Sequence, residues 1–555
     1  MLRRALIAIP SAGLALALFA CGGGNKVSTT PQDALTTATP IKHLVVIYGE
    51  NISFDHYFGT YPNATNPSGE PAFKAASGTP TVNGLTGTLL TANPNSTNTL
   101  NGTGAANPFR LDRTQAATAD QNHAYTPEQQ AYDNGLADLF PKYTGNGTSG
   151  GAGAFGTTGQ VMGYFDGNTV TALWNYAQNF AMNDNAYTTD YGPSTPGALD
   201  VVSGETNGFQ IVKTTKQPST LAKSSYYIND GQGGLTLIGD VDPANDLCSS
   251  TTDTGMLTSK NIGDLLNAQG ITWGGFMGGF NLTETNSNGT TGCKRSTLAT
   301  AVGAATADYV PHHNWFQYYA STANPNHTRP SSTAAIGSSL ETDGKTAEPA
   351  NHQYDTDDFF AAVQAGNYPS VSFLKAPAAQ DGHAGYSDPL DEQMFVTKVV
   401  NFLQQQKDWA STAVIVTYDD SDGWYDHAYT TPTHASFDSQ ADQLNGSGVC
   451  GTGTAPAGVN GGAANGRCGP GTRIPMVVIS PWAQVNYVDH TLVDQTSVVR
   501  FIEDNWLNGT RLGGGSFDST SGSIMGMFNF SGSGTNPTLY LDENLGTPVS
   551  TPPAL

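Results

Sequence analysis

Short, nearly continuous apolar runs recur along the chain and are separated by longer polar stretches. The clearest runs are residues 44–48 (LVVIY), 371–374 (VSFL), 413–418 (AVIVTY) and 476–479 (MVVI). Runs this rich in β-branched residues are typical of strands that are buried on both faces, as in a parallel sheet. They predict the core of a sheet.

Helical patterns lie between these runs, at residues 170–180, 391–409 and 495–507. In the second, Phe395, Val399 and Phe402 follow the three-to-four spacing of one helix face. Strands that alternate with helices predict an α/β fold, with a mostly parallel sheet covered by helices on both faces.

The polar stretches divide the chain into four parts. We expect a signal peptide at 1–21, a flexible Gly/Thr/Pro-rich tether at 22–40, a catalytic domain at 41–512 and a Gly/Ser/Pro-rich tail at 513–555. Residues 62–110 are expected to form a long loop or a small β excursion.

The N-terminus is typical of bacterial export. Arg3 and Arg4 precede an apolar run at 5–20, which ends at Cys21. Small residues before this cysteine predict a lipid anchor on Cys21 and a periplasmic or cell-surface location. The alternative is an ordinary signal peptide with an incidental cysteine. No other run approaches the ~20 apolar residues of a membrane span.

Four further cysteines predict two disulfides in an exported protein. Three pairings are possible, and the local one, Cys248–Cys293 with Cys450–Cys468, is the simplest.

The formal net charge is −23, and Lys and Arg form no cluster along the sequence. Nucleic acid is therefore not an expected partner, because duplex binding needs clustered cations. An anionic substrate would need a local positive centre, such as a metal ion.

Oxygen-bearing side chains follow two of the apolar runs. Glu50 and Asn51 come after the first run, and Asp419 and Asp420 come after the third. Ligands of open α/β sheets bind at the carboxyl ends of strands, and these oxygen donors suit one hard divalent cation. The alternative is that they are solvated loop residues or helix caps, but two such clusters favour a metal site.

A nucleophile candidate, Ser194, lies in the tight turn 190–197 (DYGPSTPG) before a helical pattern. A hydroxyl at a helix N-terminus is well placed to meet a phosphoryl group. Taken alone, this segment favours the simpler alternative, in which Ser194 or Thr195 caps the helix.

Several of the 11 histidines lie beside turns, where they could act as general acids or hold phosphoryl oxygens. A lone histidine is more often structural. The candidates are His123, His312, His313, His352, His383, His427 and His490.

Three blocks of sequence resemble the bacterial phosphoesterase family, which contains phosphatidylcholine-type phospholipases C and acid phosphatases. They are residues 41–59 (IKHLVVIYGENISFDHYFG), 416–427 (VTYDDSDGWYDH) and 473–482 (RIPMVVISPW) with 489–491 (DHT). The blocks come in the family's order, and the resemblance runs from about residue 41 to 507. Ile52 replaces the usual Arg, and Ser421-Asp422 departs from the usual second block.

The resemblance implies an alkaline phosphatase-like fold and a site with named roles. By match to the motifs, Ser194 would be the nucleophile, and the active-site histidines would be His123, His313 and His383. His312 and His490 would bind phosphate, although His312 could take the place of His313. The one divalent metal ion would be held by Glu50, Asn51, Asp419 and Asp420. Ser194 would form a phosphoserine, which water then hydrolyses.

Within this family, a serine at position 194 and a short segment after the last core helix favour an acid phosphatase acting on small phosphomonoesters. Phospholipase C activity on phosphatidylcholine-type lipids is the alternative. An alternative outside the enzymes is a catalytically inactive surface lipoprotein that binds ligands. The presence of Ser194 together with every candidate metal ligand argues against this alternative.

Overall fold

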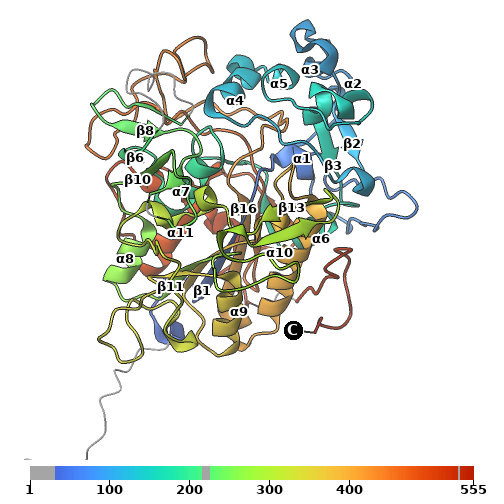
Figure 1. The fold of residues 1–555 in the computed structure, drawn as a ribbon. Coiled ribbons are helices and arrows are strands. Elements are labelled where there is room, and N and C mark those ends of the chain that lie inside the picture. The colour runs from blue at the N-terminus through green and yellow to red at the C-terminus, as the bar shows by residue number, and fades with distance from the viewer. Residues whose placement is uncertain (1–31, 215–225, 245, 535–537, 555) are drawn as a thin grey trace, which may run out of the picture.

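An eight-stranded sheet forms the centre of the protein (Figure 1). The structure is a computed structural model that describes residues 32–214, 226–244, 246–534 and 538–554. Across the sheet the strands are β14 (Gln353–Tyr354), β11 (Trp273–Met277), β15 (Val371–Lys375), β1 (His43–Gly49), β16 (Thr412–Tyr418), β17 (Met476–Ile479), β4 (Ala181–Asn183) and β18 (Tyr487–Asp489).

The sheet is mostly parallel, as predicted. Only β17 runs antiparallel to its neighbours in this sheet, β16 and β4, and the other neighbouring pairs are parallel. The sequence predicted a mostly parallel sheet but did not show that the strand at 476–479 runs antiparallel. A strand buried on both faces is a continuous apolar run in either direction, so its sequence does not reveal its direction.

Strands β1 and β16 lie side by side in the middle of the sheet. They pair in parallel register from His43 with Thr412 to Gly49 with Tyr418, and every residue of both strands is buried. Because the two strands end together, Glu50 and Asp419 emerge at the same edge of the sheet.

Helices cover both faces of the sheet, which confirms the mixed α/β class (Figure 1). One group contains α7 (Ser194–Ser203), α8 (Ile262–Ala268) and α11 (Thr496–Trp506), and the other contains α6 (Thr171–Asn179), α9 (Thr356–Gln364) and α10 (Pro389–Gln404). The three predicted helices are α6, α10 and α11. The second ends earlier than predicted, at Gln404, and a separate 3-10 turn follows at Lys407–Ser411.

Long insertions surround the sheet. Their helices are α1 (Phe54–Phe58), α2 (Thr88–Thr91), α3 (Pro94–Thr97), α4 (Tyr125–Tyr132) and α5 (Phe140–Tyr143). Their strands are β2 (Phe109–Leu111), β3 (Gly163–Phe165), β5 (Ala186–Tyr187), β6 (Phe209–Lys213), β7 (Tyr227–Asn229), β8 (Leu235–Leu237), β9 (Asp242–Pro243), β10 (Thr254–Leu257), β12 (Ser296–Ala299), β13 (Ala304–Ala307) and β19 (Val493–Asp494). Residues 62–110 are mainly loop with short helical turns.

Both disulfides follow the local pairing, Cys248 with Cys293 and Cys450 with Cys468. The Cys450–Cys468 bridge closes a short loop, whereas the segment between Cys248 and Cys293 contains α8 and the sheet strand β11.

Both ends of the described chain pack on the domain. From the segment expected as a tether, Asp33 Oδ1 lies 3.0 Å from His43 Nε2, and the Thr39 N–H donates to Asn505 at 2.9 Å. Beyond residue 513, Phe517 is buried, and Asn401 donates to the Leu541 carbonyl at 2.8 Å. The signal sequence and Cys21 lie outside the described residues. Within those residues, no helix is both long and apolar enough to cross a membrane.

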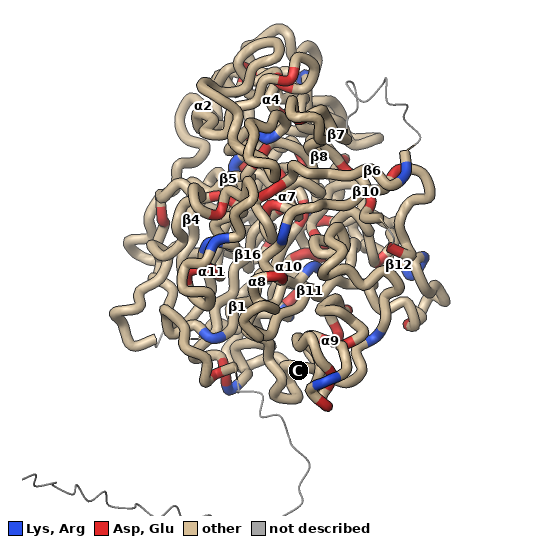
Figure 2. Tube along the Cα trace, turned by 90° about the vertical axis from the view of Figure 1, so that its left-hand side faces the viewer, with Lys and Arg blue, Asp and Glu red and all other residues tan. Residues whose placement is uncertain are grey.

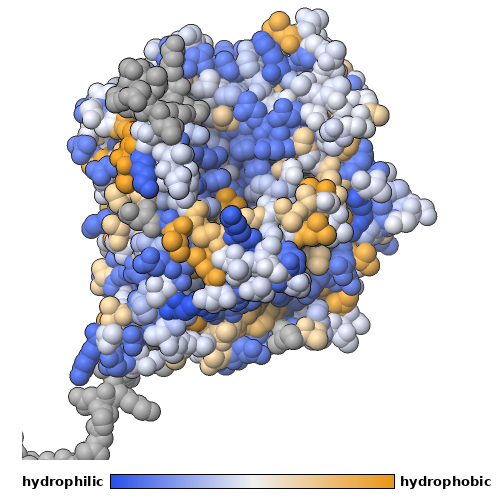
Figure 3. All heavy atoms as spheres, viewed as in Figure 1, coloured by the Kyte–Doolittle hydropathy of each residue, from blue (hydrophilic) through white to orange (hydrophobic). Residues whose placement is uncertain are grey.

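Acidic residues gather around α7 and β16, whereas Lys and Arg are scattered (Figure 2). Apolar residues form only small groups on the face seen in Figure 3, where a hydrophilic hollow lies between the groups. Part of the negative charge of the protein therefore lies in its interior near α7.

Candidate active site

Helix α7 begins where the chain makes a tight turn over the carboxyl edge of the sheet. Gly192 has a φ of 123°, a conformation that residues with a side chain rarely adopt. A Cβ atom on Gly197 would lie 2.0 Å from the carbonyl oxygen of Asp419. These two glycines let the start of α7 approach the end of β16 closely, and this approach brings Ser194 to the predicted ligands.

The Ser194 hydroxyl does not cap the helix. Its Oγ lies 3.1 Å from Glu50 Oε2 and 3.3 Å from Asp420 Oδ2, and the side chain is buried. Thr195 does not cap α7 either: its N–H and its hydroxyl both donate to Asp240 Oδ1 at 3.0 Å. The capping alternative for both residues was therefore wrong, since no side chain caps α7 and the N–H of Thr195 donates to Asp240.

The four predicted metal ligands meet at the ends of β1 and β16. The Asn51 N–H donates to Asp419 Oδ1 at 2.9 Å, and the Asp420 N–H donates to the same oxygen at 2.8 Å. Asn51 has a φ of 65°, which asparagine tolerates better than most residues. All four side chains are at most 1% exposed.

This donor set fits a hard cation. Asn51 Oδ1 and Asp419 Oδ2 are buried and have no hydrogen-bond partner among the described residues. Burial, followed by the charge of Asp419, raises the pKa of Glu50 well above its usual value. Burial also raises the pKa of Asp420. Carboxylates crowded in this way need positive charge, and their oxygens are the ligands that such an ion prefers.

Lys375 supplies part of this positive charge, and the sequence analysis missed it. It is the last residue of β15, is 1% exposed, contacts Glu50 Oε1 and has its Nζ 3.9 Å from Asp419 Oδ2. The carboxylates raise its pKa although burial opposes this. A lysine directly after an apolar run was the available signal, because it marks the same sheet edge as the acidic residues.

His123 lies beside the carboxylates and is held in a defined orientation. Its Nδ1 lies 2.9 Å from the Gln121 carbonyl oxygen and 3.1 Å from Asp422 Oδ1. Burial alone would lower the pKa of His123, but Asp420 and Asp422 outweigh burial and raise it well above 6.5. This shift favours the protonated form of His123. Asp422, one of the departures from the family pattern, helps to hold this ring together with the Gln121 carbonyl.

The other central histidines lie nearby. His313 Nδ1 is 3.1 Å from Glu50 Oε1, and the rings of His123 and His383 are 5.9 Å apart. Burial lowers the pKa of His383 to about 4, and burial together with His312 lowers the pKa of His313. Both are neutral at pH 7 and can donate or accept one hydrogen bond through each ring nitrogen, depending on tautomer.

Two histidines lie further from the serine. His312 is 3.5 Å from Asp242 and its carbonyl accepts a bond from the Thr195 hydroxyl. His490 follows β18, has a side chain that is 67% exposed, and lies 2.7 Å from Asp184. The contacts of His490 do not include the residues around Ser194, and a role for it in phosphate binding stays a prediction.

Comparison with known proteins supports the resemblance in the sequence. The model of the Phosphoesterase family matches residues 41–507. This protein belongs to the Phosphoesterase family. The matched region contains β1, α7, β15 and β16, and therefore every candidate residue of the site.

Relatives in the Phosphoesterase family include bacterial phospholipases C. The hemolytic phospholipase C of Pseudomonas aeruginosa is 23% identical over 485 residues, which cover 86% of this chain and 54% of that protein. Phospholipase C A of Mycobacterium tuberculosis is 24% identical over 482 residues, covering 84% of this chain and 72% of that protein. The chain thus spans about half the length of the hemolytic relative. An alkaline phosphatase-like topology stays a prediction.

Proposed function

We propose that this member of the Phosphoesterase family hydrolyses phosphoric esters, with Ser194 as the nucleophile. The observation that carries the proposal is the position of Ser194 Oγ, 3.1 Å from Glu50 Oε2 and 3.3 Å from Asp420 Oδ2 instead of capping α7. A hydroxyl held against two buried carboxylates at a helix N-terminus is placed both to lose its proton and to meet an anionic phosphoryl group.

The first step forms a bond from Ser194 Oγ to phosphorus and breaks the bond from phosphorus to the ester oxygen. The hydroxyl proton can pass to Glu50 or Asp420, which already accept it as a hydrogen bond. The raised pKa of His123 favours its protonated form, which can give a proton to the leaving alkoxide. In the second step water attacks the phosphorus of the phosphoserine, and the bond from phosphorus to Ser194 Oγ breaks. His123 takes a proton from this water, and Glu50 or Asp420 returns the serine proton to Oγ.

Other groups bind the phosphoryl oxygens. Lys375 contributes a buried positive charge, and His313 and His383 contribute neutral N–H donors on the same side as His123. The N-terminus of α7 adds partial positive charge. Charge and donors fixed before the substrate arrives stabilise the transition state without reorganisation.

Glu50, Asn51, Asp419 and Asp420 would hold one divalent metal ion. When bound, such an ion stabilises the deprotonated serine oxygen and polarises the phosphoryl group.

Small phosphomonoesters are our first choice of substrate. A terminal phosphate carries more charge than a diester, and His123 and Lys375 supply two positive charges near Ser194. Phospholipids are the second candidate, because the relatives from Pseudomonas aeruginosa and Mycobacterium tuberculosis are named phospholipases C.

One set of assays separates these functions. Wild type and Ser194→Ala are incubated with p-nitrophenyl phosphate and with phosphatidylcholine vesicles, with and without EDTA. We expect hydrolysis of the monoester that EDTA and Ser194→Ala both abolish. Faster release of phosphocholine would identify a phospholipase C instead. A folded wild-type protein that binds phosphate but turns over neither substrate would indicate an inactive binding protein.

We also propose export with a lipid anchor on Cys21, on the basis of the apolar run that ends there. Wild type should partition with membranes, whereas Cys21→Ser should be soluble or unprocessed. The same soluble behaviour in both forms would argue for an ordinary signal peptide.

A further inference from the structure

Glu128 is a buried carboxylate that the mechanism above does not use. It lies near the start of α4, five residues after His123, and is 1% exposed. A glutamate at the start of a helix is often there because it interacts favourably with the helix dipole. The carboxylate of Glu128 has a second set of contacts, since it accepts hydrogen bonds from two other segments of the chain.

The first of these segments is the turn that carries Ser194. The Gly192 N–H donates to Glu128 Oε2 at 3.1 Å. A Cβ atom on Gly192 would lie 3.7 Å from the Cβ of Tyr125, so the turn also packs directly against the start of α4. Because Gly192 comes two residues before Ser194, the bond to Glu128 fixes the turn close to the nucleophile.

The second segment is the loop that follows the predicted metal ligands at the end of β16. Ser421, directly after Asp420, donates its hydroxyl to Glu128 Oε1 at 2.8 Å and accepts the Gly423 N–H at 3.0 Å. A Cβ atom on Gly423 would lie 2.7 Å from the Asn122 carbonyl oxygen, so this loop also passes close to the segment that leads into α4. Glu128 therefore contacts the loop directly behind the predicted ligands.

Burial makes these two hydrogen bonds important. It raises the pKa of Glu128 to about 7, whereas the hydrogen bonds from Ser421 and Gly192 and the charge of His123 oppose this rise. Each carboxylate oxygen accepts from one donor, and each donor belongs to a segment that carries site residues. Without Glu128, a buried N–H and a buried hydroxyl would lose their acceptor, so both segments would gain by moving towards another partner.

We propose that Glu128 is a positioning residue, which joins the turn of Ser194 to the loop of the metal ligands and sets both relative to His123. This role rests on the proposed function, in which Ser194 Oγ attacks phosphorus and His123 protonates the leaving group. Glu128 would not touch the substrate. It would keep Ser194 Oγ aligned with the phosphoryl group, where a misplacement of about 1 Å can cost about 10²-fold in rate.

Glu128→Gln tests this role while keeping the size of the side chain. The amide oxygen can accept one of the two hydrogen bonds, but the amide nitrogen cannot accept the other. We expect kcat to fall by about 10–100-fold with KM within ~3-fold of wild type, because the groups proposed to bind the phosphoryl oxygens are unchanged. The fall should be equal for p-nitrophenyl phosphate and for alkyl phosphates, since Glu128 gives no proton to the leaving group.

Ser421→Ala shows whether Glu128 acts through its two partners. On its own, this variant removes one of the bonds and should lower kcat by about 10-fold. In its background, the amide oxygen introduced by Glu128→Gln is free to accept the Gly192 N–H. Adding Glu128→Gln should therefore lower kcat by no more than a further ~3-fold, and fully additive losses would overturn the proposal.

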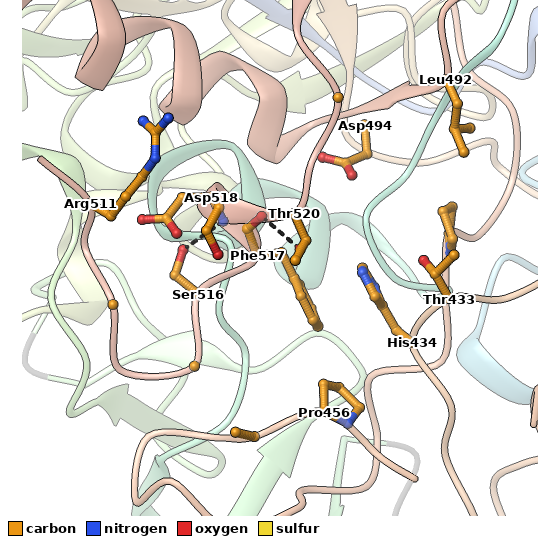
Figure 4. A pocket seen from close by; sticks show the side chains of 16 residues that line it. Thr433, His434, Pro456, Leu492, Asp494, Arg511, Ser516, Phe517, Asp518 and Thr520 are labelled. Atoms are coloured by element: carbon orange, nitrogen blue, oxygen red, sulfur yellow. Dashed lines mark hydrogen bonds between the residues drawn. The ribbon is translucent and has the colours of Figure 1, made fainter. Parts of the chain in front are cut away.

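Glu503→Gln is the matched control, because Glu503 is also a buried glutamate that accepts at both oxygens. It lies on α11, is 0% exposed, and accepts from Arg511 at 2.8 Å and from the Leu512 N–H at 2.9 Å. Figure 4 shows Arg511 at a pocket of about 640 Å³, and none of the described residues that line this pocket belongs to the site around Ser194. Glu503→Gln should lower the Tm but keep kcat within ~2-fold of wild type.

A rapid acid quench measures the affected step directly. Wild type, Glu128→Gln and Glu503→Gln are mixed with p-nitrophenyl phosphate, and phosphate on Ser194 is followed by mass spectrometry. We expect phosphoserine to form at least ~10-fold more slowly in Glu128→Gln than in the other two proteins.

Formation at the wild-type rate in Glu128→Gln, or an equal slowing in Glu503→Gln, would overturn the positioning role. Absence of phosphoserine in the wild type would refute the nucleophile itself and this role with it. The failure of the positioning role alone and the failure of the proposed function therefore give different results.

Discussion

Replacing Lys375 with methionine removes a buried positive charge and keeps a side chain of similar length. In the wild type, Lys375 contacts Glu50 and lies 3.9 Å from Asp419. In EDTA, the variant leaves these buried carboxylates without that partner. Removing one partner of a buried ion pair costs about 3–5 kcal/mol, so the free energy of unfolding should fall by this amount.

A divalent cation should reduce this loss. If the ion binds Glu50 and Asp419, it supplies the missing charge and no longer competes with the ammonium group. By linkage, every ~1.4 kcal/mol recovered with saturating cation corresponds to about tenfold tighter binding of the cation by the variant. The loss of stability and the gain in affinity can therefore be checked against each other.

The assay is urea unfolding of wild type and Lys375→Met, in EDTA and in Mg²⁺, Ca²⁺ or Mn²⁺, together with calorimetric titration of each ion. Lys398→Met is the control, because Lys398 is exposed on α10. Its ammonium lies 5.0 Å from the centroid of the Phe360 ring, and loss of this contact should cost no more than ~1 kcal/mol. The reasoning would be refuted if Lys375→Met lost the same free energy of unfolding in EDTA and in each of the three ions. The ion would then not bind the carboxylates that Lys375 contacts.

Four further predictions concern the surroundings of the serine and one disulfide. Thr195→Ala loses hydrogen bonds to Asp240 and to the His312 carbonyl, so the free energy of unfolding in urea should fall by about 1–2 kcal/mol. Its turnover should stay within ~10-fold of wild type, and a much larger loss of turnover would contradict a structural role. His123→Gln should slow hydrolysis of alkyl phosphates by about 10²–10⁴-fold and p-nitrophenyl phosphate far less, because nitrophenolate leaves without a proton. The pKa of His123 is raised above 6.5, so wild-type activity on alkyl phosphates should fall only when the pH exceeds this raised pKa. A fall in activity already centred near pH 6.5 would contradict the role of His123 as the proton donor. Replacing Cys450 and Cys468 with serine opens a loop of sequence separation 18 and should cost about 3 kcal/mol in urea unfolding; unchanged stability would show that the bridge is dispensable.

The sequence predicted the centre of the sheet because its strands are long and apolar. Strands β1, β15, β16 and β17 were all visible as apolar runs. Strand β11 was missed because two of its five residues are glycines, and β4 was missed because it has only three residues. In the structure, pairing with neighbouring strands holds β4 and β11 in the sheet, and such pairing leaves no periodic pattern in the sequence.

The site was predictable where it depends on strand ends and not where it depends on tertiary contacts. Glu50 and Asp419 follow strands directly, so a rule about the sheet edge was enough to find them. The same rule applied to basic residues would have found Lys375. The partner of Thr195, Asp240, is distant in sequence, and only the folded structure shows that it replaces a helix cap.

The central claim is that Ser194 is phosphorylated during turnover. Wild type mixed with p-nitrophenyl phosphate can be quenched in acid within milliseconds, digested and examined by mass spectrometry. The account predicts one phosphate on Ser194 that appears before steady state and disappears when substrate is exhausted, with none in Ser194→Ala, which should lose turnover by several orders of magnitude. Normal turnover by Ser194→Ala, with no phosphorylated residue in the wild type, would contradict the account and indicate direct attack by water.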